Sequence, residues 1–203
     1  MADKGTAATR SESREQRTIA RILAAARECF SRLGIEKTTI VDIAEAAEYS
    51  RPVIYKHFND KADIVDRVCL EEMQAVQAGL NERIARDLPF AEQLTQAIGE
   101  AVVLAHGNIY IKRFMEDNEA WVRSQTEAGT VHRWVRERWE RFLARDKAEG
   151  ILADDLDIEQ CVTWISMVQS LLLLRYASED LDTAAMRAFV RRFVVTPLLK
   201  PAA

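Results

Sequence analysis

The 203-residue sequence predicts an all-α fold of about nine helices. Apolar residues recur at helical spacing along most of the chain, and few segments alternate as strands do. Only seven glycines and four prolines occur, and most of them fall where a helix should end, as at Gly34, Pro89, Gly107 and Gly150. With 48% hydrophobic residues, the chain can bury a sizeable core.

The composition excludes several classes of protein. The longest apolar run near the C-terminus, 171–174, is far shorter than the roughly 20 residues of a membrane-spanning helix. Residues 1–17 are polar and charged and lack the apolar segment of a secretory signal. The three cysteines, Cys29, Cys69 and Cys161, stand among apolar neighbours, which is typical of buried thiols in a reducing compartment. We therefore expect a cytoplasmic protein without a membrane partner.

Charge is distributed unevenly along the chain. The formal net charge is −4, but residues 1–68 hold 12 basic against 11 acidic side chains, which leaves 16 against 21 for the remainder. A global balance of this sign gives no support for non-specific binding to nucleic acid. Any contact with DNA must therefore be local.

The first predicted helix covers residues 14–33. Its apolar positions follow the spacing of an amphipathic helix: Ile19, Ile22, Leu23, Ala26, Phe30 and Leu33. Gly34 then ends this helix in the manner of a C-cap. Residues 1–13 precede the pattern and are expected to form a flexible tail. A second, short helix begins after Thr39, because Asp42 stands three residues later and completes a start that resembles a capping box.

A third helix is predicted from Pro52 to Phe58. Proline lacks an amide hydrogen and is well tolerated only in a first turn, and it disfavours helical angles at Arg51 before it. Ile54 and Phe58 share one face of this helix. The opposite side and its flanks carry the remaining residues: Pro52, Val53, Tyr55, Lys56 and His57. Such a face can meet phosphates, base edges and thymine methyl groups.

Together, the second and third helices have the length of a helix-turn-helix. The segment from Thr39 to Phe58, TIVDIAEAAEYSRPVIYKHF, spans 20 residues, about what two short crossing helices and a turn of three or four residues occupy. Short helices with Lys, His and Tyr outside also occur in ordinary helical domains. The spacing, more than the composition of one helix, therefore favours a DNA-reading helix.

Residues 34–66, GIEKTTIVDIAEAAEYSRPVIYKHFNDKADIVD, resemble the signature of the TetR family of transcriptional regulators. The shared features are a Thr-Thr pair, Ile-Ala, a Ser at the turn, Tyr-x-His-Phe and a Lys that opens the fourth helix. The resemblance implies a three-helix DNA-binding domain over 14–60 and a helical ligand-binding and dimerisation domain over 61–203. Beyond residue 68 the chain resembles the family only in length and helical character.

The same resemblance implies how this segment meets DNA. Contacts to the phosphate backbone would come from Thr39, Ser50, Tyr55, His57 and Lys61, and contacts in the major groove from Arg51, Pro52, Val53 and Lys56. Two positions depart from the family pattern. Glu48 stands where a Gly is usual, so either it adopts a positive φ or the turn differs. Pro52 often has a small residue in its place, which the first-turn position tolerates.

A fourth helix is predicted from Lys61 to Arg86, long enough to reach from one domain into the next. Five further helices are expected over 89–106, 108–117, a segment ending near 150, 157–176 and 182–195. The helix over 157–176 is apolar on nearly every face, so it should lie between its own core and another helical surface. The resemblance implies that the last two helices form a dimer bundle with a second copy. Burial within one chain is the alternative.

Aromatic and sulfur-containing residues in the middle of the chain predict an apolar cavity for a small molecule. The candidate ligand-binding residues are His106, Tyr110, Phe114, Trp121, Gln125, Trp134, Trp164, Met167 and Gln169. Ordinary core packing is the alternative for each aromatic residue. The three histidines have no carboxylate or thiol neighbours at ligand spacing, so we expect neither a metal site nor a cofactor.

These observations predict a homodimeric transcriptional regulator. We expect a repressor that binds a palindromic operator in double-stranded DNA and is released by a bulky, largely apolar effector. The alternatives are an activator, or a helical adaptor whose apolar C-terminal helices bind another protein. The sequence contains no nucleophile elbow, phosphate loop or zinc motif, so an enzyme is not expected.

Overall fold

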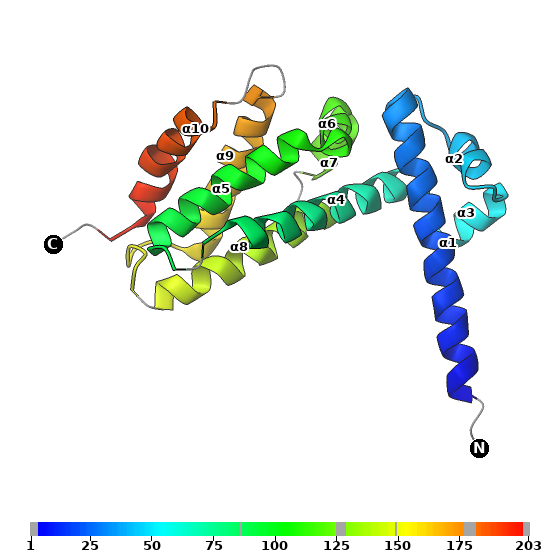
Figure 1. The fold of residues 1–203 in the computed structure, drawn as a ribbon, viewed down its shortest axis with the longest axis horizontal. Helices are drawn as coiled ribbons and strands as arrows, with labels where there is room; N and C mark the ends of the chain where they lie inside the picture. The colour runs from blue at the N-terminus through cyan, green and yellow to red at the C-terminus, as the bar shows by residue number, and fades with distance from the viewer. Residues whose placement is uncertain (1–3, 86, 125–128, 149, 177–181, 201–203) are drawn as a thin grey trace.

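The computed structural model describes residues 4–85, 87–124, 129–148, 150–176 and 182–200 of the chain. Ten α-helices lie within these ranges, and none of the described residues belongs to a named strand. The predicted all-α class is therefore confirmed. Figure 1 shows two helical units that are joined by one long helix, α4 (Lys61–Arg83).

The N-terminal unit consists of α1 (Lys4–Leu33), α2 (Ile40–Ala46) and α3 (Arg51–His57), with α2 and α3 on one side of α1 (Figure 1). Its core contains large apolar side chains from the three helices and the residue after them: Ile22, Leu23, Phe30, Ile43, Ile54 and Phe58. The tail expected over 1–13 is instead helical from residue 4 on. Ala, Arg and Glu in this segment are strong helix formers and no proline interrupts them, so the helix continues outward from its packed half.

A tight turn after α2 orients α3. Glu48 has a φ of 54°, in the left-handed region that residues other than glycine rarely adopt. Of the two possibilities that the sequence left open here, the structure has the positive φ. The Glu48 carboxylate pairs with the guanidinium of Arg21 in α1, which also lies 5.2 Å from the centre of the Tyr49 ring. These contacts hold the turn against α1.

Helix α4 belongs to both units. Asp60 caps its start by accepting a hydrogen bond from the backbone N–H of Asp63 at 2.9 Å. The helix ends at Arg83, before the predicted end at residue 86, because Ile84 takes extended backbone angles. Its first half buries Ile64, Val65, Val68 and Cys69 in the N-terminal core, and its second half buries Val76 and Leu80 in the C-terminal unit.

The C-terminal unit is built from α5 (Phe90–Gly107), α6 (Ile109–Glu116), α7 (Asn118–Ser124), α8 (Thr130–Ala148), α9 (Ile158–Tyr176) and α10 (Thr183–Phe189). A π-helical turn over Val190–Val195 and a 3-10 turn over Thr196–Leu198 follow α10. Two helices, α7 and α8, occupy the segment for which the sequence predicted one. In Figure 1, α5 and α8 run along α4, and α9 and α10 lie at the end that holds the C-terminus.

A carboxylate between two arginines fixes the C-terminal end of α4. The side chain of Glu100 in α5 is only 11% exposed, and it accepts hydrogen bonds from Arg83 of α4 at 3.1 Å and from Arg187 of α10. The end of α4 is thereby tied to both α5 and α10.

All three cysteines are buried, as the sequence predicted. Burial raises the pKa of the Cys69 thiol, which stays protonated at neutral pH. Within the described ranges, none of the helices has the length and apolar character that crossing a membrane requires.

The positive φ at Glu48 predicts that a glycine variant there is more stable than an alanine variant, the reverse of the order inside a helix. Both Glu48→Gly and Glu48→Ala lose the exposed pair with Arg21, so their difference isolates the backbone. We expect the glycine variant to be more stable by about 1 kcal/mol, because a side chain in left-handed backbone costs about that much. At Glu45, an exposed residue inside α2, alanine should instead exceed glycine by about 1 kcal/mol. Urea unfolding of the four variants gives both differences; the same order at both positions would contradict the turn geometry.

Candidate DNA-binding surface and effector cavity

Helix α3 presents a continuous outer face to solvent. It begins at Arg51 rather than at Pro52, with Ser50 as the N-cap and Pro52 in the first turn. Ile54 is fully buried beneath it. Four residues of the predicted contact set are exposed on α3 itself: Arg51, Pro52, Tyr55 and Lys56, with Val53 half-buried beside them. Neither Arg51 nor Lys56 forms a salt bridge with a described residue, so both cations are available to an anionic partner.

Two hydroxyl groups stand at the starts of α2 and α3. Thr39 caps α2 in a full capping box: its hydroxyl oxygen accepts from the Asp42 N–H at 3.3 Å, and the Asp42 side chain accepts from the Thr39 N–H at 2.7 Å. The Thr39 hydroxyl also donates to the Asp42 carboxylate at 2.6 Å. These hydrogen bonds lower the pKa of the Asp42 carboxyl group. Ser50 makes no capping hydrogen bond with its side chain, which leaves that hydroxyl for an external phosphate.

His57 and Lys61 are engaged inside the N-terminal unit. The His57 side chain is 6% exposed, and its Nδ1 atom lies 3.5 Å from a carboxylate oxygen of Glu15 in α1. The Lys61 ammonium donates to the backbone carbonyls of Ile35 and Glu36 at 3.0 and 3.1 Å. Lys61 thus closes the loop between α1 and α2 onto the start of α4, and contact with DNA by these two residues stays a prediction.

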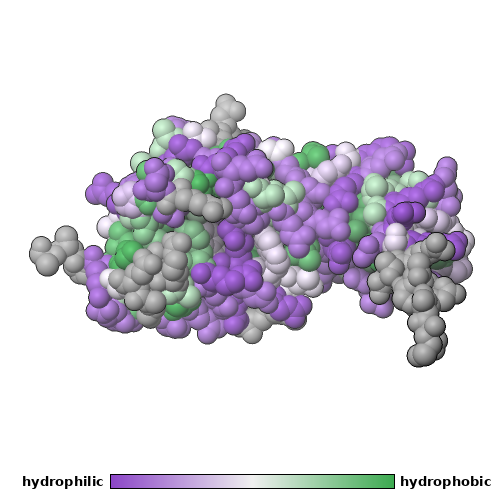
Figure 2. Space-filling view, turned by 60° about the horizontal axis from the view of Figure 1, so that its bottom comes forward, coloured by the Kyte–Doolittle hydropathy of each residue, from purple (hydrophilic) through white to green (hydrophobic). Residues whose placement is uncertain are grey.

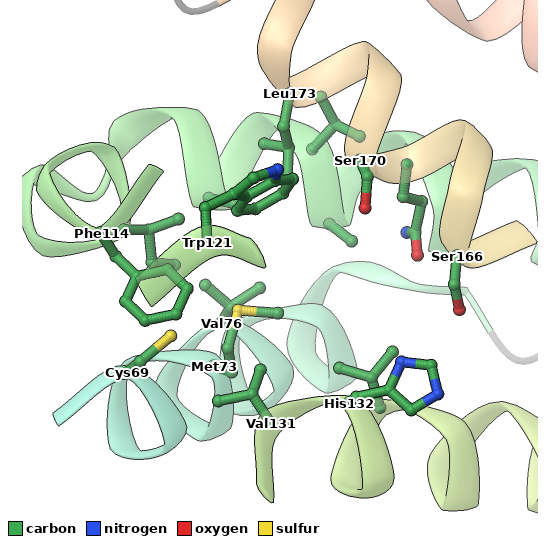
Figure 3. A pocket seen from close by; sticks show the side chains of 16 residues that line it. Cys69, Met73, Val76, Phe114, Trp121, Val131, His132, Ser166, Ser170 and Leu173 are labelled. Atoms are coloured by element: carbon green, nitrogen blue, oxygen red, sulfur yellow. The ribbon is translucent and has the colours of Figure 1, made fainter. Parts of the chain in front are cut away.

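The main cavity lies in the C-terminal unit and has a volume of about 110 Å³. Side chains from α4 to α9 line it, and most of them are apolar (Figure 3). In Figure 3, Phe114 and Cys69 lie on one side and His132 and Ser166 on the other. Because hydroxyl and imidazole groups are confined to one side, the cavity can orient a molecule that is apolar over most of its length.

Two smaller hollows adjoin the main cavity. One, of about 50 Å³, lies between α4, α5, α8 and α9 and shares five wall residues with the main cavity: Met73, Val76, Ala101, Val135 and Gln169. We call it the inner hollow. The other, of about 100 Å³, shares only Ala105 and Leu173 and opens beside His106 and Lys112, and we call it the outer hollow.

The candidate ligand-binding residues divide among these spaces. Phe114, Trp121 and Gln169 line the main cavity, Trp134 lines the inner hollow and His106 lines the outer hollow. Tyr110 lines none of the three. Trp164 and Met167 do not reach the cavity, because they project from the opposite face of α9 and are 43% and 56% exposed. Gln125 lies outside the described residues.

Several cavity residues went unrecognised in the sequence, among them Cys69, Met73, His132, Ser166 and Ser170. The sequence did contain one signal for these residues. Ser166, Gln169, Ser170 and Leu173 have helical spacing, so three polar side chains share one face of the otherwise apolar helix α9.

Gln169 has a structural partner on each side: its amide oxygen accepts from the Trp139 indole at 3.2 Å, and its amide nitrogen donates to the Ile98 carbonyl at 3.3 Å.

The wall of the main cavity is continuous with the core of the helix-turn-helix. Phe114 of α6, Val131 of α8 and Cys69 of α4 line the cavity, and all three belong to the same buried cluster as Ile43 and Ile54 of α2 and α3. Trp121 packs against this cluster as well. Displacing the wall therefore disturbs side chains that position α3.

A polar relay runs parallel to this apolar contact. Glu72 of α4 accepts from Arg27 of α1 at 2.7 Å and, with its other oxygen, from the side chain of Asn108 at 2.7 Å. Burial opposes the charge of Arg27, but the hydrogen bonds that Arg27 donates to Glu71 and Glu72, together with their negative charges, outweigh burial and raise the Arg27 pKa. Asn108 also caps α6 by accepting from the N–H groups of residues 110 and 111. Helix α6, which carries cavity residues, is thus linked to α1 through one carboxylate.

An exposed helix α3 over a capped helix-turn-helix, with a cavity behind it, is the arrangement expected of a DNA-binding regulator. The comparisons agree. Residues 22–68 match the sequence profile of bacterial regulatory proteins of the tetR family. This segment therefore resembles the DNA-binding part of the TetR family, as its sequence indicated.

Relatives and solved structures extend the match. The HTH-type transcriptional regulator TtgR of Pseudomonas putida is 45% identical over 56 residues, which span 28% of this chain and only 27% of TtgR. The HTH-type transcriptional repressor KstR2 of Mycobacterium tuberculosis is 25% identical over 158 residues, 72% of this chain and 78% of that protein. The fold is similar to that of the transcriptional regulator FadR of Bacillus subtilis in complex with stearoyl-CoA, with a TM-score of 0.65, 18% identity and coverage of 88% and 98%.

Two lysines of the DNA-binding segment are expected to behave differently. Lys56→Ala should leave stability unchanged and weaken DNA binding, because its ammonium has no internal partner. Lys61→Ala should lower the free energy of unfolding by about 1 to 2 kcal/mol, because two carbonyls lose a charged donor. Urea unfolding, together with DNA titrations at two salt concentrations, separates the effects. Equal stability of the two variants would show that the Lys61 hydrogen bonds contribute nothing.

Proposed function

We propose that the chain is a cytoplasmic, ligand-responsive transcriptional repressor that binds a palindromic operator as a homodimer. The observation that carries the proposal is the shared cluster, in which Cys69, Phe114 and Val131 pack with the core of the helix-turn-helix and also line the cavity. Occupancy of the cavity and placement of α3 are thereby coupled. In an activator the same coupling would operate, but occupancy of the cavity would favour DNA binding instead of opposing it.

The size of the main cavity supports release by a bulky effector. An apolar cavity of about 150 Å³ holds benzene, so about 110 Å³ admits only a small ring or a short chain. A larger effector fits only after the wall has moved. Such an effector has a higher affinity for the state with the displaced wall, and this difference in affinity is what shifts the equilibrium away from the DNA-binding state.

Movement of the wall has a route to the two reading helices. Displacement of Phe114 or Trp121 moves α6 and α7, and α6 pulls on Glu72 through Asn108. On the same side, Arg123 of α7 donates to Asp66 of α4 at 2.9 Å. Helix α4 therefore receives the displacement at two points close to α1 and transmits it to the spacing of the two copies of α3.

An apolar surface on the last helices supports the homodimer. Large hydrophobic side chains are exposed on α9, α10 and the turn after it: Trp164, Met167, Leu171, Leu174, Phe189 and Phe193. The rings of Phe189 and Phe193 lie 5.3 Å apart. Figure 2 shows one face of the molecule, on which hydrophobic residues gather toward the end that holds the C-terminus. Covering such a surface with its twofold copy removes it from water.

The relatives suggest which effectors to test first. The FadR structure contains stearoyl-CoA, and another protein of similar fold is described as the ketosteroid regulator KstR2 of Mycobacterium tuberculosis. Acyl chains and fused rings are both long and apolar, which suits a cavity with polar groups on one side only. We propose an effector of this general type for the present chain.

The dimer predicts a strong effect of one charge on the exposed surface. Leu171→Glu should produce a monomer at micromolar concentration and abolish tight operator binding, because Leu171 is 63% exposed at the middle of the apolar surface. Val122→Glu is the matched control, since Val122 is 61% exposed on α7. Light scattering measures both. A wild-type monomer would refute the dimer, and a wild-type monomer that captures a different protein would favour the adaptor function instead.

The relay predicts a variant that binds DNA but responds weakly to effector. Asn108→Ser keeps a capping oxygen for α6 and removes the amide that reaches Glu72. Operator affinity without effector should stay within about twofold, while the effector-induced loss of affinity should fall several-fold.

The measurement uses an operator selected from random DNA and a titration with acyl and steroid compounds. Asn81→Ser on α4, which removes only a hydrogen bond from Gln77, is the control. An unchanged effector response in Asn108→Ser would remove the relay from the mechanism. Failure to select any DNA sequence would refute the proposed function as a whole.

A further inference from the structure

A half-buried cation in the inner hollow has no acidic partner among the described residues. Arg138 of α8 lines this hollow together with Gln77 and Leu80 of α4 and Trp134 of α8. Its Nε–H donates to the side-chain oxygen of Gln77, and Arg138 forms no salt bridge with any described residue. The other two nitrogens of the guanidinium are therefore not committed to a carboxylate.

The charge of Arg138 is poorly compensated by its surroundings. Burial disfavours the charged form and the positive charge of Arg141 adds to this effect, so the pKa of Arg138 is lowered. By contrast, Arg27 and Arg123, which face carboxylates, have raised pKa values. A guanidinium removed from water without a counter-charge gains affinity for any anion that enters beside it.

The inner hollow has the dimensions of a single anionic group. A cavity needs roughly 10–15 Å³ of this kind of volume to hold one water. The inner hollow, at about 50 Å³, therefore has room for roughly three to five waters, and a carboxylate or a phosphate occupies a similar space. The inner hollow shares five wall residues with the main cavity. A ligand in the main cavity therefore reaches Arg138 by displacing side chains such as Gln169 and Val135.

We propose that the effector is an amphipathic anion whose apolar body fills the main cavity and whose carboxylate or phosphate binds Arg138 in the inner hollow. This inference rests on the proposed function and names the chemical class of its ligand. A guanidinium suits both anions, because it offers paired donors to two oxygens. The apolar body would extend toward Phe114 and Trp121, and the anion would lie against α4 at Gln77.

The other cation beside the cavity is less suited to this role. Lys112 lines the outer hollow, which shares only Ala105 and Leu173 with the main cavity. Glu116 lines the same hollow and introduces a carboxylate there, although Arg113 pairs with it at 2.9 Å. An anion at this end meets one repelling group that the inner hollow lacks. Lys112 therefore provides the matched control.

The test compares ligands that share a chain and differ in the head group. Decanoate, decyl phosphate, decanoyl-CoA and 1-decanol are titrated against the full chain by calorimetry and by the emission of Trp121 and its neighbours. Decanoate or decyl phosphate should bind at least about tenfold more tightly than decanol. Whichever of these two anions binds more tightly identifies the natural head group as a carboxylate or a phosphate. If only decanoyl-CoA bound tightly, the placement of the head group in so small a hollow would be overturned.

Variants locate the anion. Arg138→Gln should remove the tenfold preference for the anion over decanol and leave the affinity for decanol unchanged. Arg138→Lys should retain part of this preference. Lys112→Gln should change neither the preference nor the affinity for decanol. The unfolding midpoint of Arg138→Gln should not fall, because an uncompensated cation is lost, which separates a binding role from a structural one. Equal binding of decanoate and decanol by the wild type, loss of preference in Lys112→Gln, or no binding of any probe would each overturn the inference.

Operator release separates this inference from the proposed function. If decanol releases the operator as well as decanoate does, the regulatory function stands and the role of Arg138 fails. If decanoate binds with the predicted dependence on Arg138 but leaves operator affinity unchanged, the anion site stands and the regulatory function fails.

Discussion

One continuous helix, α4, contributes side chains to two hydrophobic cores, and the arrangement of both units depends on it. Val65 and Cys69 pack with the helix-turn-helix, whereas Val76 and Leu80 pack with α5 and α6. A rigid element shared in this way cannot shift at one end without disturbing the other, because close-packed interiors respond as discrete arrangements rather than by continuous deformation. The separation of reading helix and cavity in sequence is therefore no barrier to their coupling.

Charged groups fix the middle and the C-terminal end of α4 where apolar packing alone would permit sliding. At its midpoint, Glu72 holds Arg27 and Asn108, and near its end Glu100 holds Arg83 and receives Arg187. Each carboxylate is largely shielded from water, so breaking one contact exposes a poorly solvated charge. Such contacts favour a few defined positions of the helix over many intermediate ones, which is the property required of a two-state regulator.

Local signals in the sequence were sufficient for the helix-turn-helix and insufficient for the cavity. The capping box at Thr39 and the first-turn position of Pro52 act within a few residues, so both could be inferred without tertiary structure. The first residues of α1 show no apolar periodicity, so the sequence did not predict that the helix begins at residue 4. Trp164 could not be assigned to a side, because α9 is apolar on both faces and only the assembled fold distinguishes cavity from exterior. In the sequence, Arg138 resembles any other charged residue of α8, and only the fold shows that no described carboxylate pairs with it.

The uneven charge along the chain would affect how the proposed regulator approaches DNA. Residues 1–68 are nearly neutral with exposed cations on α3, whereas the remainder carries 16 basic against 21 acidic side chains, and α4 sets the two apart. The molecule is thus an electric dipole aligned roughly with α4. In the field of a polyanion it experiences a torque that turns the N-terminal unit forward and repels the acidic end. With a Debye length of roughly 8 Å at physiological ionic strength, this orientation acts only during the final approach, where it rejects reversed collisions before any base is read.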